Sequence, residues 1–233
     1  MADSGIEVGE DGKARCWWAG SDVLYRPYHD REWGRPVGED HRLFEKLNLE
    51  GFMSGLSWLT ILRKRDRFRA VFAGFDPDAV SRFTTEDEKR LLADAGIVRN
   101  RAKIAATINN AHRYGELKSE FGSLAAYVWA FEPAGRPRLP GREALMQIKF
   151  SPEAAAMSKD LRKRGWAFVG PTTVYSFMQA VGVVNDHLEQ CYVGAEVEEE
   201  RIAFARPKPL RPITAAIGRQ QSGRRRPDSS DLD

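Results

Sequence analysis

Cysteine is scarce in this chain of 233 residues, which contains only Cys16 and Cys191. Two cysteines cannot build the disulfide framework of a small secreted domain, and in a cytoplasmic protein such a pair is more often metal-bound or free. The first 13 residues are acidic and polar, so they do not resemble a secretory signal. We therefore expect a cytoplasmic protein.

Long apolar runs are also missing. No stretch approaches the roughly 20 consecutive apolar residues that a membrane-spanning helix needs, so no membrane partner is expected. Convincing alternation of apolar and polar residues, which is typical of half-buried strands, is absent as well, whereas apolar residues recur at helical spacing. These features predict an all-α fold.

Capping residues mark the starts of several expected helices. Thr85 with Glu88 fits a capping box, Ser123 can cap the helix that follows it, and Ser151 is followed by a proline suited to the first helical position. The expected helices cover residues 41–51, 55–72, 91–96, 100–114, 124–131, 152–165, 171–182 and 185–191.

Composition divides the chain into three parts. Residues 1–14 are small and acidic without apolar periodicity, and we expect them to be disordered. Residues 15–195 hold the helical segments and form the folded unit, with no internal repeat. Residues 196–233 form a charged tail that turns rich in proline, arginine and serine and cannot build a core.

The chain also lacks a strong excess of charge of either sign, since its net charge is only +3. The distribution is more informative, because basic residues cluster at Arg63–Arg69, at Arg162–Arg164 and in the tail at Arg224–Arg226. A single basic cluster is usually a solvated face. Two clusters beside aromatic-rich segments favour a polyanion as partner.

Each of the two cysteines is accompanied by a histidine, one pair near each end of the folded unit. Cys16 is followed by His29, and His187 precedes Cys191 by four residues, which puts the second pair on one face of a helix if residues 185–191 are helical. Together they make a Cys₂His₂ set suited to zinc, although packed core residues are an equally good interpretation of the spacing. Four protein ligands would leave no position for an activated water, so such a zinc would be structural and would tie the two ends of the unit together.

Two helices joined by a short turn with Gly170 indicate a helix–hairpin–helix arrangement. The second helix starts at Pro171, Thr172 and Thr173, and its free backbone N–H groups with the helix dipole suit a DNA phosphate, which a glycine allows to approach closely. Helical hairpins with a glycine are also common in all-α proteins without this function, so the pattern alone leaves both alternatives open.

Aromatic side chains crowd the segments around the first expected metal ligands and around Glu50. They are Trp17, Trp18, Tyr25, Tyr28, Trp33 and Trp58. Such residues are normally core, but an isolated carboxylate in the apolar stretch LNLEG needs a partner or a function. Aromatic faces and a carboxylate acceptor suit a flat, electron-poor heterocycle, and a cationic base best of all.

Four segments together resemble the bacterial DNA-3-methyladenine glycosylase I family of alkylation-repair enzymes. They are CWWAGSDVLYRPYHDREWG, LEGFMSGLSWLTILRKRDRFR, DAGIVRNRAKIAATINNA and LRKRGWAFVGPTTVYSFMQAVGVVNDHLEQC, which span about residues 15–192. The resemblance implies a monomeric helix–hairpin–helix enzyme that binds double-stranded alkylated DNA. It implies that this enzyme hydrolyses the N-glycosidic bond of 3-methyladenine by base flipping, releasing the free base and leaving an abasic site.

The resemblance also assigns residues. It implies one structural Zn²⁺ on Cys16, His29, His187 and Cys191, a catalytic Glu50, and a base pocket of Trp18, Tyr25, Tyr28, Trp33, Glu50 and Trp58. It implies DNA contacts by the hairpin residues Gly170, Thr172 and Thr173 and by a probing loop, Gly51–Ser57, with Leu56 as a wedge. Met53 stands where the family often has glutamine, and Asp186 is expected to act indirectly.

Two other functions remain possible from the residues alone. An open metal site would make the protein a zinc hydrolase. A protein that binds but does not cleave would be a non-catalytic, zinc-stabilised DNA-damage-binding module. Loss of the metal and release of a free base are the observations that separate these alternatives from the glycosylase.

Overall fold

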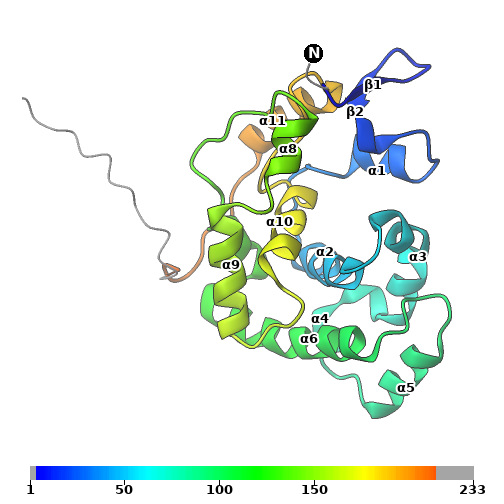
Figure 1. Ribbon diagram of the computed structural model, residues 1–233. Helices are drawn as coiled ribbons and strands as arrows, with labels where there is room; N and C mark the ends of the chain where they lie inside the picture. Colours follow the sequence, from blue (N-terminus) through cyan, green and yellow to red (C-terminus); the bar gives the residue numbers. More distant parts are fainter. Residues whose placement is uncertain (1–3, 214–233) are drawn as a thin grey trace, which may run out of the picture.

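The computed structural model describes residues 4–213, which are mostly helical (Figure 1). Two short strands, β1 (Ile6–Val8) and β2 (Ala14–Cys16), pair antiparallel. The helices are α1 (Tyr25–Arg31), α2 (Asp40–Met53), α3 (Trp58–Val71), α4 (Pro77–Val80), α5 (Thr85–Ala93), α6 (Arg101–Phe121), α7 (Leu124–Trp129), α8 (Arg142–Gln147), α9 (Pro152–Lys163), α10 (Pro171–Ala180) and α11 (Tyr192–Ala203), with 3-10 turns η1 (Trp17–Ala19) and η2 (Ala73–Phe75). Within the described range, no helix has the length and apolarity to cross a membrane.

Helix starts follow the capping residues closely. The hydroxyls of Ser123 and Ser151 each accept a backbone N–H in the first turn of α7 and α9, as predicted. Gly165 follows the end of α9 with φ of 83°, the left-handed conformation that favours glycine after a helix. The capping box of α5 lies one residue earlier than predicted, because Thr84 and Asp87 make the reciprocal bonds.

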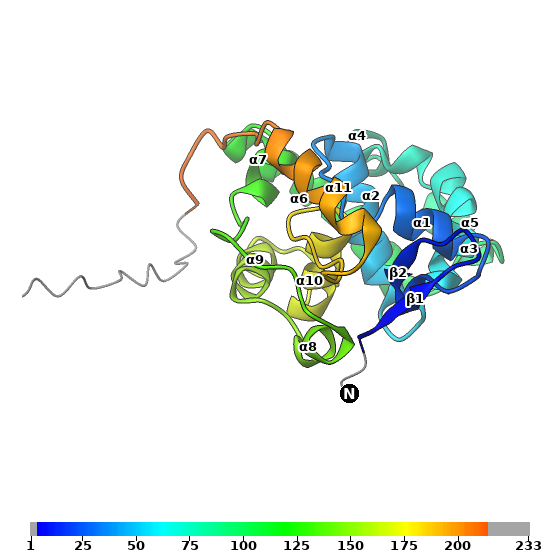
Figure 2. The same ribbon diagram turned by 90° about the horizontal axis from the view of Figure 1, so that it is seen from above.

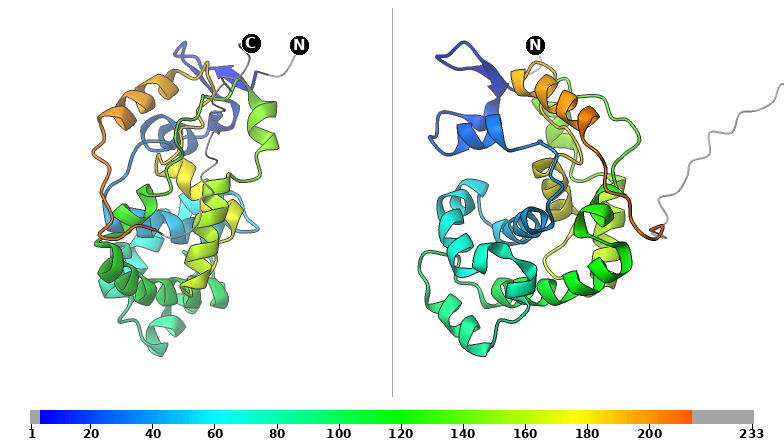
Figure 3. Two further views of the ribbon diagram at one scale, coloured as in Figure 1. Left: turned by 90° about the vertical axis from the view of Figure 1, so that its left-hand side faces the viewer. Right: turned by 180° about the vertical axis from the view of Figure 1, so that it is seen from behind.

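Helices α2 and α10 pack against each other in the middle of the molecule, and α9 lies alongside α10 (Figures 1 and 3). Helices α4, α5 and α6 lie at one end of the molecule, and the strands, α1, α8 and α11 lie at the other (Figure 1), which faces the viewer in Figure 2. The core is rich in phenylalanine, with Phe44, Phe52, Phe68, Phe72, Phe121 and Phe177 fully buried. Half-buried Asp40 ties α2 to α7, since its carboxylate accepts hydrogen bonds from the backbone N–H groups of Leu124 and Ala125.

Three expectations for the two chain ends are wrong. Residues 4–14 were expected to be disordered, but Ile6–Val8 pairs with Ala14–Cys16, so part of that segment forms a strand. Residues 185–191 form turns instead of a helix. The boundary expected at residue 195 falls inside α11, which lies beside β2; the part of the tail beyond residue 213 is outside the described residues. In each case, contacts between the two chain ends determine the local structure, and the local sequence pattern does not.

Candidate active site and metal centre

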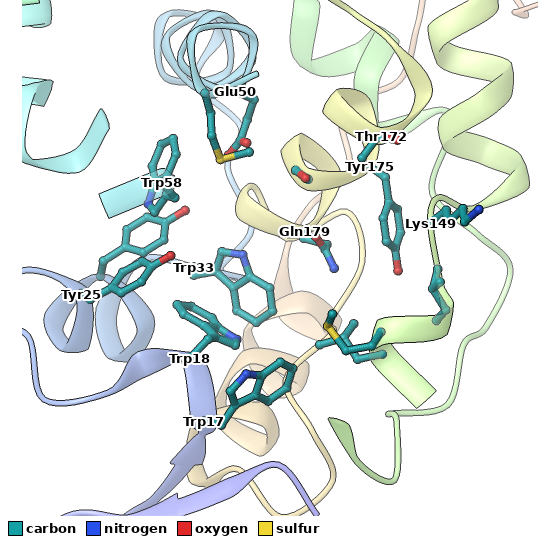
Figure 4. A pocket seen from close by; sticks show the side chains of 16 residues that line it. Trp17, Trp18, Tyr25, Trp33, Glu50, Trp58, Lys149, Thr172, Tyr175 and Gln179 are labelled. Carbon is teal, nitrogen blue, oxygen red and sulfur yellow. The ribbon is translucent and has the colours of Figure 1, made fainter. Parts of the chain in front are cut away.

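A cavity of about 300 Å³ opens between α1, α2 and α3 on one side and α8 and α10 on the other (Figure 4). All six residues predicted for a base pocket line it. The lining residues are Trp17, Trp18, Tyr25, Tyr28, Trp33, Glu50, Met53, Trp58, Leu145, Met146, Ile148, Lys149, Thr172, Tyr175, Ser176 and Gln179. Glu50 is the only carboxylate among them, so recognition of a positive charge by a carboxylate within the cavity wall depends on it.

Aromatic rings form one wall by packing edge to face. Trp18 lies 4.8 Å from Trp33 and 5.4 Å from Tyr25 between ring centroids, with interplanar angles of 76° and 61°. Tyr28 lies 5.3 Å from Trp58. Such contacts hold the rings in place, and these side chains border the open space of the cavity (Figure 4).

Glu50 lies near the end of α2 and is only 4% exposed. Its Oε2 atom is buried without a hydrogen-bond partner. Burial raises the pKa of the Glu50 carboxyl to about 7, and the charge of Lys46 opposes part of that rise. An unpartnered carboxylate oxygen beside open aromatic faces is an acceptor for a ligand N–H group, because leaving it unpaired is costly.

A buried ion network lies behind the Tyr28–Trp58 wall, and the sequence analysis did not find it. Lys46 forms an ion pair with Glu32 at 2.8 Å, and Arg65 forms one with the same carboxylate at 2.7 Å. Arg65 also pairs with Glu45 at 2.6 Å. The signal was present in the sequence as EKLNLE, which places a lysine four residues before Glu50 on the same face of a helix.

The opposite wall is organised by Asp186, which is fully buried and does not line the cavity. Its carboxylate accepts hydrogen bonds from the Tyr175 hydroxyl at 2.5 Å and the Gln179 amide at 2.8 Å, and pairs with Arg136 at 3.0 Å. Tyr175 and Gln179 do line the cavity (Figure 4). Asp186 therefore reaches the cavity only through these two side chains, and its indirect role stays a prediction.

The four predicted metal ligands meet at one buried point. Their ligand atoms all lie within 4.8 Å of one another, so Cys16, His29, His187 and Cys191 could hold a metal ion. The Cys191 sulfur lies 3.5 Å from His29 Nε2 and 3.5 Å from His187 Nδ1, and the Cys16 sulfur lies 3.9 Å from His187 Nδ1. The predicted reason for the second pair was wrong, because turns at 185–191 rather than a helix bring them together.

The other nitrogen of each histidine ring is held by the protein. His29 Nδ1 bonds to the Asp30 carboxylate at 2.8 Å, and His187 Nε2 bonds to the Trp33 carbonyl at 3.0 Å. Both partners accept a hydrogen bond from a ring N–H, so the proton stays on His29 Nδ1 and His187 Nε2, and His29 Nε2 and His187 Nδ1 are free to act as ligands. Burial lowers the pKa of His187, which favours the neutral ring that coordination requires.

The cluster of Cys16, His29, His187 and Cys191 directly supports the aromatic wall. The ring of Trp18 packs edge-on against His29 at 4.9 Å, and the ring of Trp33 packs against His187 at 4.7 Å. Both tryptophans line the cavity. Any loss of order at the metal centre is therefore transmitted to the surface that a ligand would contact.

The predicted DNA-contacting residues lie outside the aromatic wall. Leu56 is 44% exposed in the turn between α2 and α3, and the Lys103 ammonium group secures this turn by donating to the carbonyls of Phe52 and Ser54. Gly170 is the N-cap of α10, and Thr172 lies in its first turn, where it also reaches the cavity. Thr173 lies in the same turn and does not line the cavity.

Comparison of the sequence with known proteins identifies one family. A family model described as methyladenine glycosylase matches residues 18–194. Over 178 residues the chain is 46% identical to DNA-3-methyladenine glycosylase 1 of Escherichia coli K12, which spans 76% of this chain and 95% of that protein.

Solved structures agree with the sequence relatives. A crystal structure of 3-methyladenine DNA glycosylase I matches with a TM-score of 0.71 at 44% identity, over 76% of this chain and 98% of that one. A variant of 3-methyladenine DNA glycosylase I in complex with 3-methyladenine matches with a TM-score of 0.72 at 34% identity, over 77% of this chain and 97% of that one. Since the family model covers most of the sequence and these relatives align along nearly their whole length, this chain belongs to the methyladenine glycosylase family.

Proposed function

We propose that this protein is a DNA repair glycosylase that hydrolyses the N-glycosidic bond of 3-methyladenine in alkylated DNA and leaves an abasic site. The observation that carries the proposal is the buried, unpartnered oxygen of Glu50 inside an aromatic cavity. A methylated purine presents a flat ring to the aromatic faces and an N–H edge to the carboxylate. A relative with the same fold has been solved with 3-methyladenine bound.

The chemistry of the lesion matches a cavity with a single carboxylate. Methylation at N3 puts a positive charge on adenine, so its glycosidic bond is already weak and the base departs as a neutral molecule. No strong general acid is needed. Glu50 accepts hydrogen bonds from the amine edge of the base, while the rings of Trp18 and Trp58 attract its positive charge.

The base must leave the DNA stack to reach Glu50, at a cost of a few kcal/mol that is lower for a damaged base. We infer that Leu56, exposed on its turn, fills the gap that the base leaves. We infer further that α9, residues 164–170 and α10 form a DNA-binding helix–hairpin–helix. The backbone N–H groups around Thr172 and Thr173 at the start of α10 would hold a phosphate near the cavity mouth.

The donor set of the buried cluster fits one structural Zn²⁺. Tetrahedral zinc with two sulfur and two nitrogen ligands requires sulfur–nitrogen separations of about 3.5 Å, and the measured separations are 3.5, 3.5 and 3.9 Å. When bound, the ion would cross-link β2 and α1 to the segment before α11. With four protein ligands it would have no position for water, which argues against a zinc hydrolase.

We propose that the folded unit, predicted as residues 15–195, works as a monomer with double-stranded DNA. As a repair enzyme it would act in the bacterial cytoplasm, where the chromosome lies. The β1–β2 pair and α11 belong to this unit, since β2 and α11 pack together at the metal centre.

Assaying base release is the direct test of the proposed reaction. Incubation with DNA treated with a methylating agent is expected to release free 3-methyladenine, which chromatography detects, and to leave sites that alkali cleaves. We propose that water, and not an amine of the protein, attacks the sugar, so the protein itself should not cut the strand. Binding to methylated DNA without release of any base would identify a non-catalytic damage-binding module instead.

Truncation of the wedge should separate DNA handling from base recognition. Leu56→Ala is expected to slow excision from duplex DNA about tenfold, because an everted base returns to the stack more readily when the gap is unfilled. Affinity for the free base should not change, since Leu56 does not line the cavity. Equal excision rates for the two proteins would remove Leu56 from the mechanism.

A further inference from the structure

Lys46 is almost completely buried, with 2% of its surface exposed, and lies outside the cavity behind two of its rings. Its ammonium nitrogen lies 4.3 Å from the ring centroid of Tyr28 and 4.7 Å from that of Trp58. It also donates to the Tyr28 hydroxyl at 3.1 Å. One cation that does not line the cavity therefore contacts both rings, and burial of a lysine at this depth requires compensation by its surroundings.

The buried charges around Lys46 already balance without Glu50. Glu32 pairs with Lys46 and Arg65, and Glu45 pairs with Arg65. Arg69, whose side chain is 43% exposed, joins Glu45 from the surface and also pairs with Asp66. Glu50, one helical turn beyond Lys46 on the same face of α2, makes no ion pair within this network and is reached by the Lys46 charge without a direct contact.

We propose that Lys46 is a positioning residue of the base cavity: it fixes the rings of Tyr28 and Trp58 from behind and supplies the positive charge that keeps Glu50 a hydrogen-bond acceptor at neutral pH. This inference rests on the proposed function, because it concerns the same cavity and the same ligand. It assigns a role in recognition to a residue that touches neither the base nor the solvent.

The electrostatic consequence is a narrow pH window. Burial raises the pKa of Glu50 to about 7, and the Lys46 charge limits that rise. Burial lowers the pKa of Lys46 to about 8, and Glu32 limits that fall. Glu50 is thus ionised above about pH 7 and Lys46 is charged below about pH 8, so both charges coexist only between these values.

The tyrosines, Arg65 and Glu32 around Glu50 do not change charge in this window. Tyr25 and Tyr28 face it from α1, and its charge contributes to raising the pKa of both, so neither titrates in this window. Arg65 of α3 keeps its proton throughout, with a pKa far above its usual range because of Glu32 and Glu45. Burial alone would lower the pKa of Arg65, but its partners Glu32 and Glu45 more than offset this effect. Glu32 stays ionised because Lys46 and Arg65 lower its pKa to about 2 against burial.

The test measures free 3-methyladenine binding by calorimetry from pH 6 to pH 9. For the wild type we expect affinity to fall on both sides of the window. Lys46→Met should move the acid limb up by about one pH unit and lower affinity at pH 7.5 about threefold, because Glu50 loses its neighbouring positive charge. Lys46→Arg should restore most of the wild-type profile. Lys89→Met, at an exposed lysine of α5, is the matched control and should change nothing.

Carbon NMR of Glu50 in the ligand-free protein tests the same inference without the base. Its titration midpoint should rise in Lys46→Met, with Glu50→Gln used to assign the resonance. If the methionine variant does not fold, Glu32→Gln provides the second route: Lys46 loses its partner, and the alkaline limb of binding should move to lower pH.

The outcomes distinguish a failure of the proposed function from a failure of the role proposed for Lys46. A wild-type protein that neither binds nor releases 3-methyladenine would overturn the proposed function, whatever Glu50 does in the NMR titration. A Glu50 midpoint and a binding profile that are unchanged in Lys46→Met would overturn the role of Lys46 and leave the glycosylase proposal intact.

Discussion

Replacement of Glu50 by glutamine is expected to weaken binding of free 3-methyladenine roughly 100-fold at pH 8, which corresponds to about 3 kcal/mol. The change keeps the size of the side chain but removes the charge and replaces one acceptor oxygen with an N–H donor group. That group would face the amine edge of the base, where two donors meet and neither finds an acceptor. Calorimetry with the free base measures the effect, and affinity for undamaged DNA should stay nearly the same.

The same substitution should make the protein more stable, which excludes unfolding as the cause of lost binding. The folded state raises the pKa of the Glu50 carboxyl to about 7 from its ordinary 4.5. A carboxyl whose pKa is raised by folding contributes stability that is fully present below pH 4.5 and is lost as the pH rises through about 7. Above pH 7, where the buried charge is a burden, Glu50→Gln should increase the free energy of unfolding by on the order of 2 kcal/mol.

A matched variant sharpens this experiment. Glu116→Gln removes a carboxylate that pairs with Arg113 on the surface of α6, so it should alter neither base affinity nor stability appreciably. Denaturant unfolding at pH 5 and pH 8 gives the stability of each protein. If Glu50→Gln bound the free base as tightly as the wild type, Glu50 would not be the recognition group and the proposed mechanism would be wrong.

Local signals predicted most of the helical core. Ser123 and Ser151 cap their helices as expected, because a side-chain hydroxyl can satisfy a free N–H in any structural context. The short helices α1, α8 and α11 were not predicted. Helices of 6–12 residues have little stability of their own and form because they pack against the rest of the molecule.

The sequence identified the residues that line the site, but it did not identify the residues that hold them in place. Glu50 and the rings beside it stand out in the sequence, because a carboxylate in an apolar stretch needs an explanation. Lys46 lies in the same stretch, yet its ion pair depends on Glu32, which lies beyond α1 and reaches it only in the folded chain. The Asp186 contacts to Tyr175 and Gln179 likewise depend on turns that carry no periodic signal.

For the four residues of the Cys–His cluster, too, the sequence identified the residues but not the contacts that bring them together. Pairing each cysteine with a histidine identified all four residues, although the helix expected at 185–191 does not exist. The identity of the ligands follows from chemistry, since thiolates and imidazoles are the ligands that zinc prefers. Their convergence follows from a long-range contact between β2 and the chain before α11, which no local pattern encodes.

Removal of the metal is expected to have the largest effect on stability of any change considered. Without an ion, two sulfurs and two imidazole nitrogens buried within 4.8 Å of one another are left with their mutual contacts and the backbone N–H of Leu188. Loss of a structural zinc should therefore cost on the order of 5 kcal/mol or more, which is comparable to the whole stability of a small domain. Circular dichroism and thermal unfolding after chelation should show a large drop in the melting temperature, reversed by added Zn²⁺.

Substitutions at single ligands make this prediction specific. Cys191→Ser should lower the bound metal, measured by elemental analysis, and lower the melting temperature in parallel. The chain offers matched controls in its two other histidines, since His41 and His112 are exposed and lie outside the cluster. His112→Ala should retain the full metal content and the wild-type melting temperature.

The order of the losses decides what the metal does. Because Trp18 and Trp33 pack on the two histidine ligands, partial chelation should weaken base binding and unfold the β1–β2 end together, as one event. Tryptophan fluorescence and base affinity followed in the same titration would measure this. If activity disappeared while the fold and the fluorescence stayed unchanged, the metal would belong to the chemistry rather than to the scaffold, and a hydrolase with an open coordination position would be the better description.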